Sequence, residues 1–576
     1  MDVGELLAFQ PGKPNLKRRS EEEEDIAYEE QEVRPRKDRH REVSQNAAEG
    51  ISSLTEEQQE QINKIVNQEP EGPSLDDAAL RKMILNFEKK VFRNQEMRIK
   101  FTDQPEKFME SELELNDAIQ ELHVIATIPE MYHHLVELNA VKSFIQLISH
   151  ENVDISIAVI DLLQELTDVD SLTDNEQDAG ILIDALLEDQ VVATLVTNLD
   201  RLDDNIKEES NGIHNTLAII ENILELASDM CAEVAAQNLM QWLLKKLKPK
   251  VPFTPNKLYA SEIIAILLQN TDGCRSLLGE LEGIDALLQQ LAVFKRQDPN
   301  STEEFEMMEN LFNCMCSALL YPPNKEKFLK GEGLQLMNLM LREKKQSRFS
   351  ALKVMNHAVT GANAADNCMK FIEILGLRNI FPLFMKTPKK QKKGPSEMEH
   401  EEHVCAIISA LLRNCTGTHR QRLVGKFTEA DHAKVDRLIE LHFKYMDRVQ
   451  VVDNRIEKEK QLRLKEGDII DDNQEDEYFM RRLDAGLFTL QLVDFIILEL
   501  CCNSGVSSIR ERVMKLLNMR GGSISAIRGI VREYAGNIGD ANSEEQGELE
   551  RVKLMELVEK AQELVELFVQ SMFHKR

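Results

Sequence analysis

Residues 283–291 read GIDALLQQL, and residues 333–341 read GLQLMNLML. In both stretches apolar residues stand one, four and eight positions after the glycine, which places them on one face of a helix. The same triplet recurs along the chain, with first members 51, 48, 44, 50 and 43 residues apart. The triplets are Val141/Phe144/Ile148, Val192/Leu195/Leu199, Met240/Leu243/Leu247, Ile284/Leu287/Leu291, Leu334/Met337/Leu341 and Leu377/Ile380/Phe384.

Each triplet is followed by a second apolar helical pattern, such as DISIAVIDLLQEL at residues 154–166. A period of roughly 40 to 47 residues with two or three helices is typical of armadillo and HEAT repeats. One such unit cannot cover its own apolar face, so neighbouring units stack. The sequence therefore predicts an all-α fold, an α-solenoid of armadillo/HEAT-like repeats that forms a curved superhelix. The alternative, an irregular helical bundle, would show no fixed period.

The composition agrees with a helical protein. Of 576 residues only 5% are aromatic, and Gly (25) and Pro (16) are few. The nine cysteines have no regular spacing, so we expect reduced thiols. No apolar run approaches the roughly 18 to 20 residues that cross a bilayer, so no membrane partner is expected.

Three regions are predicted along the chain. Residues 1–75 are polar and charged and read as a disordered tail. Residues 76–540 carry the repeats, with capping helices at 76–135 and a basic loop at 386–397. Residues 541–576 form a polar segment and a C-terminal amphipathic helix, which would cap the array or bind a partner.

Negative charge is concentrated in the N-terminal half of the predicted array. Residues 103–240 hold 30 acidic residues and four basic ones, a net of 4 − 30 = −26, whereas the whole chain carries −30. Such a block attracts cations and repels phosphate backbones, so direct nucleic-acid binding is not expected.

The acidic residues have two readings. They could form a solvated outer surface that only keeps the protein soluble, but ordinary helix surfaces mix both signs. No lysine or arginine occurs between Lys142 and Arg201, which favours a surface that binds basic peptides. The candidates for this role are Glu165, Asp168, Asp170, Asp203, Asp204, Glu221 and Glu225.

Two basic clusters lie in the tail, and their spacing suits a bipartite nuclear localisation signal read by importin alpha. The alternative is solvated charge. The residues are Lys17, Arg18, Arg19, Arg34, Arg36 and Lys37.

Motifs of catalysis are not recognised. His400 and His403 are three residues apart, whereas a zincin helix places its histidines four apart, and no third ligand is indicated. Nothing in the sequence indicates an enzyme, a metal or a cofactor.

Several long segments resemble the family of beta-catenin-like proteins. They include KMILNFEKK at 82–90, KFMESELELNDAIQELHVIAT at 107–127, FLKGEGLQLMNLMLREKK at 328–345 and EYAGNIGD at 533–540. The likeness covers nearly all of residues 76–540. The resemblance implies an armadillo-like nuclear protein of the spliceosome-associated Prp-nineteen complex.

The same resemblance implies particular partners. These are basic localisation sequences of splicing factors, notably the Cdc-five-like Myb-type factor, and activation-induced deaminase in organisms that have it. Importin-type arrays hold such peptides with repeated tryptophan and asparagine pairs, whereas Trp242 is the single tryptophan here. Recognition would then depend on carboxylates and shape. A homodimer is also possible.

The resemblance further implies a leucine-rich export signal within residues 128–138, carried by Ile128, Met131, Leu135 and Leu138. A buried repeat helix requires the same spacing, and we favour that core role.

We therefore expect a non-enzymatic nuclear scaffold that docks basic segments of splicing proteins. The main alternative is an importin-like nuclear transport adaptor. A third possibility, an adhesion or signalling role like that of beta-catenin itself, would require a basic groove and disagrees with the sign of the charge.

Overall fold

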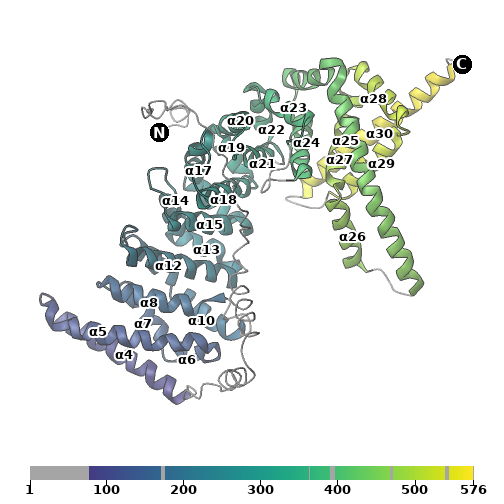
Figure 1. The fold of residues 1–576 in the computed structure, drawn as a ribbon. Helices are drawn as coiled ribbons and strands as arrows, with labels where there is room; N and C mark the ends of the chain where they lie inside the picture. Colours follow the sequence, from purple (N-terminus) through teal and green to yellow (C-terminus); the bar gives the residue numbers. More distant parts are fainter. Residues whose placement is uncertain are drawn as a thin grey trace, which may run out of the picture.

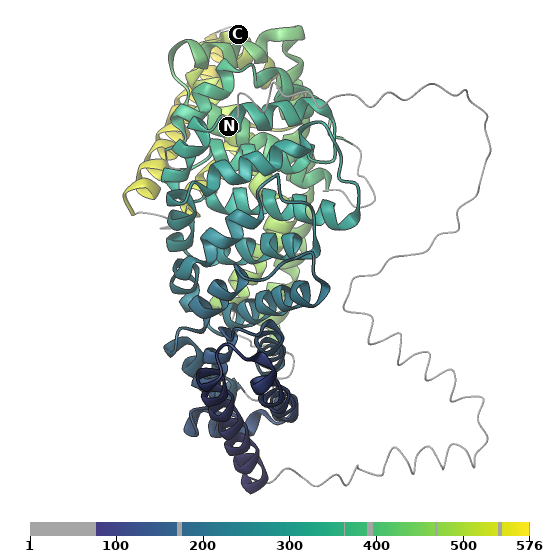
Figure 2. The same cartoon turned by 90° about the vertical axis from the view of Figure 1, so that its left-hand side faces the viewer.

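The computed structural model describes residues 77–169, 176–361, 363–388, 396–466, 471–538 and 544–574. Helices make up the ordered structure, and no strand occurs in these ranges. Figure 1 shows the helices stacked one upon another from α4 to α23, where the stack turns toward the C-terminal helices. From the side, Figure 2 shows the same stack rising from the purple N-terminal helices to the green ones. The fold is an α-solenoid, as predicted.

The N-terminal end consists of two antiparallel helices, α4 (Asp77–Lys100) and α5 (Pro105–Leu122), which pack against each other. Short turns of helix follow, η2 (His123–Thr127) and η3 (Pro129–Met131). The predicted tail at 1–75 lies outside the described residues. The domain boundaries therefore remain a prediction.

The repeat unit that follows contains three helices. The first is short: α6 (Tyr132–Glu137), α10 (Glu176–Glu188), α13 (Cys231–Val234), α16 (Asp272–Glu280), α19 (Pro322–Lys330) and α22 (Ala365–Glu373). The second carries the triplet: α7 (Ala140–Ile148), α11 (Val191–Leu199), α14 (Met240–Lys246), α17 (Gly283–Leu291), α20 (Gly333–Glu343) and α23 (Leu377–Met385). The third is α8 (Val153–Leu166), α12 (Lys207–Leu226), α15 (Pro255–Asn270), α18 (Thr302–Ala318), α21 (Arg348–Val359) and α24 (Glu397–Asn414). Short connecting helices are η4 (Ser228–Met230), η5 (Ala235–Leu239) and η6 (Ala292–Lys295).

The triplets form the core of the array. Every residue of the six triplets is buried, with at most 4% of its surface exposed. Burying one large aliphatic side chain contributes roughly 1.5 to 3 kcal/mol, so the recurring triplet gives each unit a reason to pack against the next. The predicted helix-face spacing is confirmed.

The turn before each triplet helix uses a left-handed residue, two positions before the first triplet residue. The φ angles are between 56° and 63°. In the last three units this residue is followed by a glycine that does not itself have a positive φ. The glycines are needed instead for close approach, because a Cβ on Gly283, Gly333 or Gly376 would lie within 2.6 Å of the preceding first helix. The left-handed residues are Asn139, Gln190, Asn238, Glu282, Glu332 and Leu375.

The three-helix order returns twice after α24, in altered form. Helix α25 (Gly417–Glu466) is interrupted by non-helical residues at 429–432, and its second half extends as a long arm against which α26 (Asp472–Asp484) returns (Figure 1). Helix α27 (Leu487–Asn503) then occupies the third position. The last unit is α28 (Ser507–Met519), α29 (Ile524–Gly536) and α30 (Glu544–His574).

The predicted amphipathic helix of the C-terminal region is thus α30, which packs on α27 and α29 through Leu554, Leu557 and Val558. The predicted basic loop falls between α23 and α24, and residues 389–395 of it lie outside the described residues.

The third helices pack on one another in succession, from α8 through α12, α15, α18, α21 and α24 to α27 and α30. We call these the ladder helices. They form one continuous layer along the array, in which α8 and α12 each expose a narrow stripe of their surface.

No single described helix is long and apolar enough to cross a membrane. The bent pair of α26 and α27, at 65°, meets that test of length and composition jointly. Most of α27 is buried against other helices of the array.

Candidate functional site

The exposed stripe of α8 is acidic. The Asn152 side chain caps this helix by accepting a hydrogen bond from the backbone N–H of Asp154. The apolar residues then face inward, while Asp161, Glu165 and Asp168 follow one another at four and three residues on the side left open. The side chain of Glu165 is 50% exposed.

The next ladder helix, α12, repeats this arrangement. Glu221 and Glu225 are four residues apart and therefore lie on one face. Glu221 is partly buried, and Glu225 is exposed without an ion-pair partner among the described residues. Glu165 and Glu225 occupy equivalent positions, each next to the last residue of its ladder helix.

Hydrogen bonds between neighbouring ladder helices fix the acidic stripes side by side. Asn215 of α12 donates from Nδ2 to Oδ1 of Asp161, 2.7 Å away. Tyr259 of α15 donates from its hydroxyl to Oε2 of Glu221 at 2.5 Å. The five carboxylates therefore form one surface, which we call the acidic ladder face: Asp161, Glu165, Asp168, Glu221 and Glu225.

The members of this face differ in environment. Burial raises the pKa of Asp161, which the hydrogen bond from Asn215 partly offsets. Burial and the negative charge of Glu221 raise the pKa of Tyr259, so its hydroxyl stays protonated and can donate. Glu165 Oε2 lies 2.6 Å from Nδ1 of His123, and the pair carries opposite charges when His123 is protonated. Glu225 is the carboxylate that is most open to an incoming cation.

Asp203 and Asp204 lie elsewhere, in the turn between α11 and α12 at the edge of the array. Asp203 is exposed, and its Oδ1 accepts hydrogen bonds from the backbone N–H and the side chain of Asn205. These local hydrogen bonds lower the pKa of Asp203. The structure thus separates these two residues from the acidic ladder face.

Asp204 joins two repeats. Its carboxylate accepts hydrogen bonds from Lys246 Nζ at 2.8 Å, Thr254 Oγ1 at 2.8 Å, Asn256 Nδ2 at 2.7 Å and Ser210 Oγ at 2.9 Å. Burial opposes ionisation of Asp204, but these bonds outweigh it and lower its pKa to about 2. A carboxylate held by four neighbours is a structural tie rather than an open acceptor.

Two predicted acidic residues remain, Asp168 and Asp170, and the structure describes only the first. Asp168 is partly buried just beyond the end of α8, and its charge contributes to the raised pKa of Tyr132. Asp170 lies outside the described residues. The predicted set omits Asp161, although its spacing of four residues from Glu165 was the signal that could have found it.

The segment of the predicted export signal spans η3 and α6. Leu135 is fully buried, and Met131 and Leu138 are partly buried against the core. Ile128 is partly buried. This burial agrees with the core role, while export itself remains a prediction. The six basic residues of the predicted localisation signal lie outside the described residues.

The charge of the ladder changes further along the array. In α18 Glu309 accepts a hydrogen bond from Ser350 of α21 at 2.6 Å, and burial raises its pKa. Helix α21 then exposes part of Lys353, and His403 of α24 lies 3.2 Å from the Asn356 amide. Burial, together with nearby cations, lowers the pKa of His403 to about 4. Acidic character is therefore strongest on α8 and α12.

The description of the matching protein family agrees with this architecture. A protein-family model described as "Catenin-beta-like, Arm-motif containing nuclear" matches residues 56–532. The chain is 56% identical over 562 residues to beta-catenin-like protein 1 of Rattus norvegicus. The aligned region covers 97% of this chain and 100% of the rat protein. It is 31% identical over 483 residues to the beta-catenin-like protein 1 homolog of Schizosaccharomyces pombe, covering 83% and 82% of the two chains. A solved structure from work on the cadherin and beta-catenin interaction aligns with 13% identity and a TM-score of 0.43, over 74% of this chain and 66% of that chain.

Proposed function

Because the chain belongs to the catenin-beta-like family of armadillo-motif nuclear proteins, we propose that it is a non-enzymatic nuclear scaffold that holds basic segments of splicing proteins on the acidic ladder face. The proposed partners are the Cdc-five-like Myb-type factor and other proteins of the Prp-nineteen complex. Activation-induced deaminase is a further partner where the organism has it. Entry to the nucleus is proposed to use importin alpha and the basic clusters at residues 17–19 and 34–37.

The observation that carries this proposal is the repetition of an exposed carboxylate at equivalent positions of adjacent ladder helices, Glu165 and Glu225. Axes of packed helices lie about 8 to 10 Å apart. An extended chain advances about 3.3 Å per residue, so it covers this separation in roughly three residues. A segment with cationic residues at every third position therefore suits the acidic ladder face.

The affinity of such a surface is expected to be modest. Each exposed ion pair contributes about 0 to 1 kcal/mol, and about −8 kcal/mol is needed for a micromolar dissociation constant. The two exposed carboxylates alone do not supply this. Apolar contacts of lysine and arginine stems with the ladder, for example at Tyr259 and the half-buried Ile266, would have to contribute the remainder.

Charge reversal at the exposed carboxylates tests the proposal. We expect the double variant Glu165→Lys/Glu225→Lys of the full chain to bind a fluorescein-labelled peptide with a lysine at every third position at least roughly tenfold more weakly than wild type, measured by fluorescence anisotropy. These two side chains are exposed, so circular dichroism should show unchanged helicity.

A matched control changes the net charge equally at exposed positions of α28 and α30, in Glu511→Lys/Glu556→Lys. The control should bind nearly as wild type does. Equal loss in both double variants would show that only net charge matters, and unchanged binding in the first would reject the acidic ladder face as the site.

A further inference from the structure

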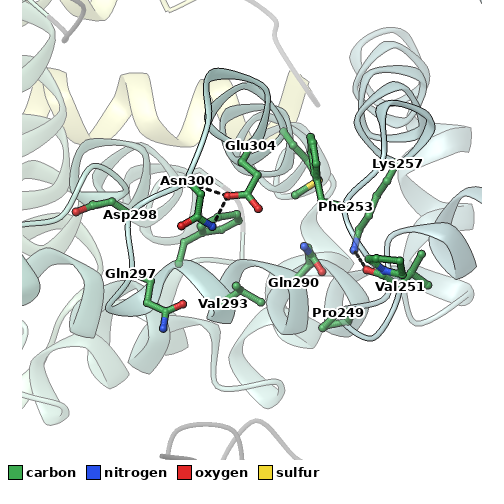
Figure 3. Close-up of a pocket in the computed structure, with 13 residues that line it drawn as sticks. Pro249, Val251, Phe253, Lys257, Gln290, Val293, Gln297, Asp298, Asn300 and Glu304 are labelled. Carbon is green, nitrogen blue, oxygen red and sulfur yellow. Dashed lines mark hydrogen bonds between the residues drawn. The ribbon is translucent and has the colours of Figure 1, made fainter. Parts of the chain in front are cut away.

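A cavity of about 180 Å³ lies at the edge of the array, between the N-terminal ends of ladder helices α15 and α18. Figure 3 shows residues of the loop before α15, of α17 and of the segment before α18 around it. Pockets for drug-sized ligands are about 300 to 1,000 Å³, whereas an engineered cavity of about 150 Å³ accepts benzene. The size therefore suits a single side chain rather than a cofactor.

Seven of the thirteen residues that line the cavity are apolar. Phe253 and Val293 stand on two sides, and Met307 is buried behind them with 3% of its surface exposed. Pro249 and Pro252 add rigid apolar surface. A guest side chain with an apolar body would bury this surface and release water, which lowers the free energy of binding.

One polar group of the lining lacks a hydrogen-bond partner among the described residues. Gln290 is only 4% exposed, and its Oε1 accepts no hydrogen bond from any residue in the described ranges. An unpaired buried acceptor costs roughly 1 to 3 kcal/mol. The guest that relieves this cost carries a hydrogen-bond donor.

A carboxylate stands on the opposite wall. Glu304 accepts two hydrogen bonds from Asn300, from the backbone N–H at 2.6 Å and from Nδ2 at 2.9 Å. Both bonds reach the same oxygen, Oε2, and they hold the carboxylate in place (Figure 3). The second oxygen gives the cavity another acceptor, this time with negative charge.

The cation on the wall is directed away from the guest. Lys257 donates from Nζ to the backbone carbonyls of Lys248 at 3.1 Å and Val251 at 2.8 Å. Figure 3 shows its bond to Val251 at one side of the cavity. Asp298 and Glu304 both line the walls, but Asp298 is paired with Lys345 at 3.0 Å, so Glu304 is the carboxylate left for a cationic guest.

We propose that this cavity receives an arginine side chain of the basic segment, with the guanidinium donating to Gln290 Oε1 and to the free oxygen of Glu304. The planar guanidinium has weakly hydrated faces that pack on apolar walls and donors on its edge, a combination that lysine lacks. The proposal rests on the proposed function, because the arginine belongs to the same basic segment. The cavity lies at the N-terminal ends of α15 and α18, whereas Glu165 and Glu225 lie at the C-terminal ends of α8 and α12, so the segment has to run across the ladder helices to reach both.

A peptide scan tests the complete proposal. In the lysine peptide described above, each lysine in turn is replaced by arginine or by its neutral analogue citrulline. With the wild-type chain, arginine at one position should tighten binding roughly five- to tenfold over lysine, and citrulline should not. The gain should disappear in Gln290→Leu and in Glu304→Gln but persist in Gln335→Leu, which removes a similar unpaired amide of α20 outside the cavity.

A second measurement is independent of the acidic ladder face. The methyl resonance of Met307, labelled with carbon-13 and assigned through Met307→Leu, should shift with millimolar N-acetyl-arginine amide in wild type and in Glu165→Lys/Glu225→Lys. It should not shift in Gln290→Leu. An equal shift with the citrulline or tryptophan amide, or no shift with the arginine amide, would overturn the arginine cavity. Loss of all peptide binding with an intact arginine shift would reject the proposed function alone.

Discussion

The ring of Phe328 occupies the space that a side chain on Gly333 would need, since an ideal Cβ on this glycine would stand 2.3 Å from the ring atom Cε2. The residue before it, Glu332, turns the chain with a φ of 58°. Phe328 lies in the last turn of α19 and Gly333 begins α20, so the glycine allows the two helices to approach closely.

Gly333→Ala should therefore destabilise the array. Overpacking in a closely packed site costs typically about 1 to 3 kcal/mol. Gly529→Ala in α29 is the matched control, because no atom lies within 4 Å of its added Cβ and alanine favours a helix by roughly 0.5 to 1 kcal/mol. Thermal melting followed by circular dichroism should place the first variant below wild type and the second at or above it. A Gly333→Ala midpoint equal to that of wild type would contradict the close approach.

The period of the triplets was readable from the sequence because each buried residue follows from the helical repeat. Turn geometry was not. Glu282 and Glu332 take the left-handed conformation, whereas the glycines that follow them do not, so a glycine does not mark the turn residue here. Backbone φ at a turn depends on the two helices that it joins, and no single residue type encodes it.

The candidate site was only partly predictable for a related reason. The i, i+4 spacing places Glu221 and Glu225 on one face, and this follows from the helix alone. The role of Asp204 does not follow from the helix alone. The cation that neutralises it is Lys246, which is 42 residues further on and just past the acidic block at residues 103–240. Charge counted along the chain cannot show which carboxylates are paired across repeats.

Asp204→Asn should weaken the joint between two repeats. The variant loses the ion pair with Lys246, and the ammonium is left 13% exposed with a neutral partner. Hydrogen bonds to a charged group are worth roughly 1.5 to 3 kcal/mol, so a loss of this order is expected at pH 7. Urea denaturation measures it. Asp203→Asn, at the exposed neighbouring position, is the control and should cost less.

The same pair gives a pH dependence with a defined sign. The folded pKa of Asp204, about 2, lies below its ordinary value of 3.8. Its contribution is therefore present above pH 4 and declines as the pH falls from about 4 toward 2. The difference in stability between wild type and Asp204→Asn should shrink over that interval, and a difference that grows at acidic pH would contradict the assignment.

A buried pair in the seventh unit permits a second stability test. His442 Nδ1 lies 2.6 Å from Asp494 Oδ1, and neither side chain exposes more than 2% of its surface. Burial raises the pKa of Asp494, and His442 offsets part of this effect. Asp494→Asn keeps an acceptor for the imidazole, so near pH 4 it should change the free energy of unfolding little. Asp494→Ala leaves the imidazole unpaired in the core and should cost roughly 1 to 3 kcal/mol.

The pH dependence of stability distinguishes the effect of the charge of Asp494 from the effect of its shape, because asparagine has nearly the same shape and no charge. An acid whose folded pKa is raised binds more protons when folded, so its contribution falls as the pH rises past the unfolded value. The asparagine of Asp494→Asn does not titrate. The free energy of unfolding of this variant, measured by urea denaturation, should therefore rise relative to that of wild type between pH 4 and pH 7. A constant difference across this range would mean that the pair carries no net pH-dependent term.

The spacing of cations in a bound segment provides the last prediction. Because Glu165 and Glu225 lie on adjacent ladder helices, a peptide with lysine at every third position should bind more tightly than its isomer with all lysines adjacent, although both carry the same charge. The preference should vanish in Glu165→Lys/Glu225→Lys. Fluorescence anisotropy in about 0.1 M and 1 M salt adds an internal check, because the screening length falls from about 10 Å to 3 Å and exposed pairs weaken first. Equal binding of the two isomers at low salt would mean that the carboxylates attract cations whatever their spacing in the peptide.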